Sequence, residues 1–199
     1  IPMEMVIYQK KSDCTFVVRD NVSISSLTPF CFQSSFSTFC KYFSMIRRLQ
    51  LFEQGLLELY NCGKYPPLTL EAYNSSMKQY YHIVKEKIIE IEGKVMKQCQ
   101  INTYLTLSSD LEDCLMRLKT LDEIHRSVVS TEPEDLNWRK TYRLLTALYK
   151  EMENSSNRER ANICASLYLS SLRVYLNIID TWLSEGRLED FRNEFLISK

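Results

Sequence analysis

Thiols and imidazoles are the side chains of this chain with the widest choice of chemistry, because they can bind metal ions or act as nucleophile and base. The only histidines are His82 and His125. The seven cysteines are Cys14, Cys31, Cys40, Cys62, Cys99, Cys114 and Cys164. No two of them have the CxxC spacing of a zinc or thioredoxin-type site. A cysteine–histidine dyad could form across helices, but no local signature supports one. The sequence therefore predicts no metal site and no catalytic residue.

Phosphate-binding and acid–base chemistry have equally little support. The four glycines, at 55, 63, 93 and 186, form neither a P-loop nor a dinucleotide-binding fingerprint. Paired carboxylates such as Asp110 and Glu112 fit the first turn of a helix, where a negative charge is favourable. We therefore predict that the protein is not an enzyme and needs no cofactor.

Charge and cysteine usage restrict the protein class. The chain has 25 basic and 25 acidic residues, which argues against a nucleic-acid or membrane-surface partner. An odd number of scattered cysteines is typical of a reducing compartment, so we predict a cytoplasmic protein. The most apolar stretch, residues 161–184, contains Arg173 and Asp180 and reads as a buried helix, not a membrane span. Because the chain opens with Ile1-Pro2, we expect a fragment of a longer protein.

Apolar residues at spacings of three and four predict five long helices. Start signals stand at Thr28-Pro29, Thr69, Ser109 with Glu112, Thr131 with Pro133 and Glu134, and near residue 158; Gly63 and Gly186 are stop signals. The fold class predicted is all-α, an elongated bundle of about five long helices. Residues 1–28 are expected to be an irregular lead-in or a short β-hairpin, because MVIY and TFVV are β-favouring runs. Residues 29–199 form the helical-bundle domain.

The same spacing predicts which side chains form the core. The predicted inward residues are Tyr73, Met77, Tyr80, Val84, Ile88, Ile91 and Val95; then Leu111, Leu115, Leu118 and Leu121 or Ile124; then Trp138, Tyr142, Leu145, Leu148 and Met152. His82 is expected on the surface and His125 half-buried. Tyr81 and Tyr168 fall off these rows, so they are candidates for contact with a protein partner.

The stretch TWLSEGRLEDFRNEFLI, residues 181–197, predicts a sharp corner at the end of the last helix. Gly186 is expected in the left-handed conformation that terminates a helix. The Asp190 carboxylate is placed to cap the next turn, and Phe191 or Phe195 can fold back onto Trp182. The chain would then continue in extended form.

The same stretch carries a pattern that resembles the signature of the gamma-tubulin complex proteins. The matching residues are Trp182, Gly186, Leu188, Asp190, Glu194, Phe195 and Ile197. The segment 171–182 is similar to the one that precedes the tryptophan in that family, although Val174 replaces the usual proline and Arg192 stands where many members have tyrosine. Residues 23–29 and 143–152 resemble one member of the family more than the others.

The resemblance implies part of an N-terminal helical-bundle domain that makes lateral contacts between neighbouring subunits of the ring that templates microtubules. It implies that gamma-tubulin binds a C-terminal domain beyond this fragment. A small accessory protein of the complex is a further candidate partner. The resemblance also implies that the signature residues form a structural corner and have no catalytic role. The implied location is the cytoplasm, at microtubule-organizing centres of the cytoskeleton. The alternative is a helical-rod tethering or adaptor subunit of the vesicle-tethering type, because many rod-like proteins share long helices.

Overall fold

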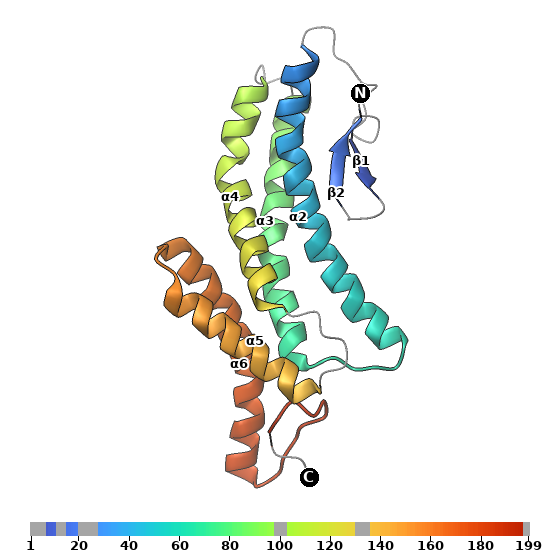
Figure 1. Cartoon of the computed structure of the whole chain (residues 1–199). Helices are drawn as coiled ribbons and strands as arrows, with labels where there is room; N and C mark the ends of the chain where they lie inside the picture. Colours follow the sequence, from blue (N-terminus) through green and yellow to red (C-terminus); the bar gives the residue numbers. More distant parts are fainter. Residues whose placement is uncertain (1–6, 11–14, 20–27, 98–102, 130–135, 197–199) are drawn as a thin grey trace. The chain divides into compact units, whose positions relative to one another are not determined.

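The computed structural model describes residues 7–10, 15–19, 28–97, 103–129 and 136–196 (Figure 1). Its contacts divide the chain into two compact units, Ile1–Phe52 and Glu53–Lys199. The predicted domain boundary at residue 28 stays a prediction. Five helices carry most of the described residues, which confirms the predicted all-α class.

The first unit combines a β-hairpin with the first turns of a long helix. Strands β1 (Ile7–Lys10) and β2 (Thr15–Val18) pair antiparallel, so the predicted hairpin is confirmed. Helix α2 (Pro29–Asn61) begins as predicted, with the Cys31 N–H donating to Thr28 Oγ1 at 3.3 Å. Hairpin and helix share a small core made of Phe16, Val18, Phe32, Phe36, Cys40 and Phe43.

The second unit holds the end of α2 and four further helices. These are α3 (Leu68–Met96), α4 (Tyr104–Val128), α5 (Asn137–Asn154) and α6 (Arg158–Glu185). Helix α6 packs against both α3 and α5 and spans the predicted range. The completely buried apolar side chains, which come from α3, α4, α5 and α6, include Tyr73, Met77, Ile124, Leu148 and Leu167.

Two predicted helix starts are wrong. Helix α4 begins at Tyr104, and its capping box joins Thr103 with Thr106, because this pair offers the same signal before Ser109 is reached. Ser109 and Glu112 therefore lie inside the helix. Thr69 is not an N-cap residue, since α3 begins one residue earlier, at Leu68. The signal at residues 131–134 lies outside the described residues, and α5 is described from Asn137.

The predicted inward faces of two helices also need correction. Helix α5 buries Thr141, Leu144 and Leu148, whereas Tyr142 is 60% exposed. An apolar pattern misses this face because one of its three buried residues is a threonine. In α3, Tyr81 is buried instead of forming a partner surface, because its hydroxyl donates to Glu53 Oε2 at 3.0 Å.

Four further predictions in α3 and α4 have mixed outcomes. Ile88 is exposed, so the predicted row of α3 is wrong at that point. The predicted row of α4 is confirmed, with Leu111, Leu115, Leu118, Leu121 and Ile124 all buried. His82 is exposed as predicted, but His125 is only 5% exposed.

Candidate functional site

The last turn of α6 begins the corner that the sequence predicts. Gly186 adopts φ +67°, and its N–H donates to the Trp182 carbonyl at 3.1 Å, so the left-handed cap is confirmed. A Cβ at residue 186 would meet no atom within 4 Å. Glycine is therefore required here by the backbone angle and not by lack of space.

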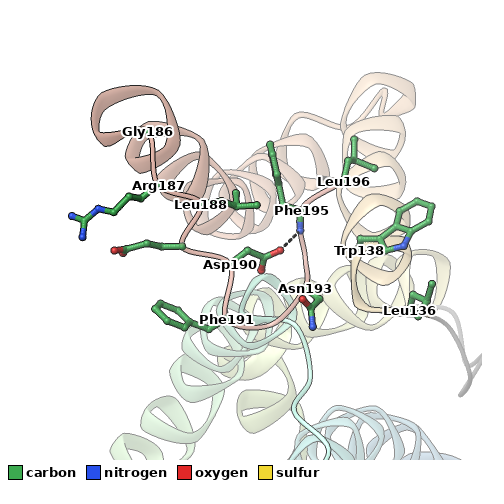
Figure 2. A pocket seen from close by; sticks show the side chains of 11 residues that line it. Leu136, Trp138, Gly186, Arg187, Leu188, Asp190, Phe191, Asn193, Phe195 and Leu196 are labelled. Atoms are coloured by element: carbon green, nitrogen blue, oxygen red, sulfur yellow. Dashed lines mark hydrogen bonds between the residues drawn. The ribbon is translucent and has the colours of Figure 1, made fainter. Parts of the chain in front are cut away.

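The Asp190 carboxylate holds the turn that follows. Its two oxygens accept hydrogen bonds from the Glu194 N–H at 2.9 Å and the Phe195 N–H at 2.8 Å, as predicted. Figure 2 shows the bond to Phe195. Phe195 folds back, with its ring centroid 5.8 Å from that of Trp182 and 5.5 Å from that of Tyr175. Phe191, the other candidate for this contact, is 83% exposed. The corner is thus fixed by one carboxylate and one aromatic ring.

Glu194 connects the corner to the beginning of α3. Its carboxylate is 1% exposed and accepts from the Leu68 N–H at 2.5 Å and the Thr69 N–H at 3.0 Å. The hydroxyls of Thr69 and Thr141 donate to the same carboxylate. A buried negative charge is favourable here, because the first N–H groups of a helix lack partners within the helix. Glu194 therefore caps α3 from a position 125 residues away.

Sequence reasoning assigned Glu194 to the corner but missed this capping role. The residue before Leu68 is Pro67, which has no side chain able to accept a hydrogen bond. A long helix without an N-cap side chain was the available signal that a cap must come from elsewhere.

Arg192 makes a second connection, from the corner to the end of α2. Its guanidinium lies 4.5 Å from the Tyr65 ring centroid and donates to the Tyr60 hydroxyl at 3.1 Å. The Tyr60 hydroxyl donates in turn to Glu71, and this hydrogen bond to a carboxylate raises the pKa of Tyr60. The Asn137 amide donates to the Tyr65 carbonyl at 3.0 Å and to the Arg192 carbonyl at 2.7 Å. Segments far apart in the sequence therefore meet at the corner.

A hollow of about 790 Å³ lies between the corner and the beginning of α5 (Figure 2). Apolar side chains on its rim are Leu136, Trp138, Phe191, Phe195 and Leu196, and Leu188 of the signature also lines it. Phe191 and Leu196 are mostly exposed. Such a surface can take apolar side chains of a protein partner. The last signature residue, Ile197, lies outside the described residues.

Among the described residues, no cysteine and no histidine lines this hollow. Burial raises the pKa of the Cys164 thiol to about 11, so this thiol is protonated at neutral pH. His125 Nδ1 lies 3.2 Å from the Tyr73 hydroxyl inside the core. Across the described ranges, no group of three or more histidine, cysteine, aspartate and glutamate residues has a geometry that could hold a metal ion. Within those same ranges, no helix has the length and apolar character that crossing a membrane demands.

Tyr168, the second tyrosine predicted to contact a partner, is half-buried. Its ring centroid lies 6.1 Å from that of Tyr149, which is 47% exposed. The two rings therefore form one of the contacts between α5 and α6.

Comparison with known proteins gives a consistent result. A family model described as "Gamma tubulin complex component N-terminal" matches residues 1–199. The mouse protein "Gamma-tubulin complex component 5" is 26% identical over 216 residues, covering 98% of this chain. The protein of the same name from Macaca fascicularis is 24% identical over 197 residues, covering 89% of the chain. The matched parts are 21% and 27% of these relatives' lengths. Component 5 is also the family member that residues 23–29 and 143–152 were predicted to resemble.

Proposed function

Because the chain belongs to the gamma-tubulin complex component N-terminal family, whose model matches residues 1–199, we propose that it is a non-catalytic scaffold within a microtubule-nucleating gamma-tubulin complex. The family predicted from the 182–197 signature is confirmed. The match along the whole chain is the observation on which the proposal rests. The corresponding location is the cytoplasm, at microtubule-organizing centres of the cytoskeleton.

In this proposal, the helical domain makes lateral contacts with neighbouring subunits of the complex. Support comes from large apolar side chains that point outward although the domain has its own core. Leu105 is 77% exposed, Tyr142 60% and Leu196 65%. Surfaces of this kind are typical of protein–protein contacts. Gamma-tubulin itself is bound by a C-terminal domain outside these residues, and the signature residues act as a structural corner.

Deletion of residues 1–199 from the full-length protein tests this division of roles. Tagged full-length and deleted proteins are purified from cells, and co-purified sibling subunits and gamma-tubulin are quantified. We expect the deletion to remove the siblings and to leave gamma-tubulin bound to the remaining domain. Undiminished recovery of siblings would refute lateral contact by this domain. Co-purification of vesicle-tethering subunits in place of gamma-tubulin complex components would support the alternative of a tethering or adaptor rod.

A further inference from the structure

Helix α6 carries a regular apolar row on the side that faces away from its own core. Leu169, Leu176 and Leu183 are 62%, 49% and 73% exposed, and each lies seven residues after the previous one. Ala165, Leu172 and Ile179 lie between them and are half-buried. We call these six residues the outer seam of α6. Their alternating spacing of four and three is the a/d pattern of a coiled-coil helix.

The fold of the second unit does not require this seam. Helix α6 packs against α3 and α5. Its buried residues lie on the opposite side of the helix from the seam, and they are Ile163, Cys164, Leu167, Ser171 and Ile178. Single exposed leucines are normal on a protein surface. A row that spans 19 residues, from Ala165 to Leu183 and about 27 Å along the helix axis, is a surface against which a second helix can pack.

Two charges flank the seam on one side. Arg173 and Asp180 are exposed, lie seven residues apart and follow Leu172 and Ile179 directly. Neither side chain forms an ion pair within the described part of the chain. On the other flank stand Tyr168, Tyr175 and Trp182, whose rings contact aromatic rings of the same chain. The seam therefore has one charged edge and one aromatic edge.

The charged edge is complementary to itself when two α6 helices run antiparallel. In that orientation the charged edges of both helices meet, so Arg173 of each copy lies beside Asp180 of the other. A parallel pair would instead place each charged edge against an aromatic edge, with no ion pair. Opposite charges at such flanking positions set helix orientation and partner choice. The chain also has a formal net charge of zero, so no long-range repulsion opposes its self-association.

We propose that the outer seam of α6 is a self-association surface, on which a second copy of this chain docks its own α6 in antiparallel orientation. Placing Leu172 beside Leu176 of the second copy also brings Leu169 beside Ile179 and Ala165 beside Leu183. This register uses all six seam residues. The proposal goes beyond the proposed function, which concerns contacts with sibling subunits. Either of the two can be refuted without affecting the other.

Charge reversal on the intact chain tests the proposal, with dissociation constants measured by analytical ultracentrifugation. We expect a reversible dimer for the unchanged chain. In Arg173→Asp or Asp180→Arg, both symmetry-related ion pairs become like-charge pairs, so the dissociation constant should rise about tenfold or more. An equimolar mixture of the two variants should form a heterodimer in which both ion pairs are restored.

A second variant distinguishes the seam from general surface effects. Leu176→Glu puts a charge at the centre of the seam and should abolish dimerisation. Leu105→Glu changes an even more exposed leucine, on α4, and should leave the dimer intact. Circular dichroism checks that both variants keep their helix content. Any of three results would overturn the proposal. The unchanged chain could stay monomeric at millimolar concentration, or the single reversals could dimerise as tightly as the unchanged chain. The third result is a mixture of the two variants that associates no more tightly than each variant alone.

Discussion

Helices α3 and α4 begin in opposite ways. At α4, Thr103 and Thr106 lie three residues apart and satisfy each other's backbone N–H groups at the exposed surface. At α3, the first N–H groups lie in a largely buried environment and bind the carboxylate of Glu194, which comes from the other end of the unit. The first cap stabilises only its own helix. The second joins α3 and α5 to the corner, so loss of this one side chain affects three elements at once.

The largest expected effect comes from Glu194→Ala. It leaves the partly buried Leu68 N–H, the buried Thr69 N–H and the two threonine hydroxyls without this acceptor. We expect a loss of about 3 kcal/mol in the free energy of unfolding. Urea denaturation followed by circular dichroism measures the loss. Glu189→Ala, an exposed neighbour, should change stability by less than about 0.5 kcal/mol. Equal losses in the two variants would show that the Glu194 carboxylate does not stabilise the beginning of α3.

Asp190→Ala should have the next largest effect. It removes both acceptors that hold the Glu194 and Phe195 N–H groups, so the corner loosens and Glu194 is positioned less well. We expect a loss of about 2 kcal/mol, because both hydrogen bonds go to a charged group. The double variant Asp190→Ala with Glu194→Ala should lose less stability than the sum of the two single losses, because both carboxylates act through one network. Full additivity would mean that the two carboxylates act independently.

Gly186→Ala tests the backbone of the corner. Alanine is strained at the positive φ of this residue, so we expect a loss of about 1 kcal/mol. Gly93→Ala is the matched control, since Gly93 lies inside α3 and a Cβ there also meets no atom within 4 Å. This control should gain about 0.5–1 kcal/mol, because alanine favours a helix interior. If both variants lost stability, or both gained it, the positive φ of Gly186 would not explain the effect of Gly186→Ala.

The smallest effect is expected at the local cap. Thr103→Ala should lower the free energy of unfolding by about 0.5–1 kcal/mol, since the affected N–H group can turn to water. Ser109→Ala, at the position that the sequence wrongly suggested as the cap, should be neutral within about 0.5 kcal/mol. Thermal unfolding of both variants measures these changes. A larger loss at Ser109 than at Thr103 would contradict the helix start at Tyr104.

Local signals explain what the sequence could predict. The bounds of α6 follow from three signals: the polar loop before Arg158, the apolar spacing of the helix itself and the stop signal at Gly186. These signals all lie within about 30 residues of one another. The contact of Asp190 with the following turn is local in the same sense. Such features depend on neighbours in the sequence, so residue type and spacing suffice to predict them.

Contacts between distant residues explain what the sequence could not predict. The buried side of α5 contains Thr141, which is hidden because its hydroxyl reaches Glu194. Tyr81 is buried because Glu53 accepts its hydroxyl. In both cases a polar group lies inside the protein through a partner on another element, and no periodicity of apolar residues reveals that partner.

The long-range cap has a consequence for how the chain is made. During synthesis on the ribosome, the residues of α3 emerge well before Glu194, so the helix start is without its carboxylate until nearly the whole unit has left the exit tunnel. Contacts that join such distant residues slow folding and make it cooperative. A nascent chain arrested before residue 194 should therefore expose the beginning of α3 to proteases and chaperones. The second unit should become stable only after Glu194 has left the ribosome and can bind the first N–H groups of α3.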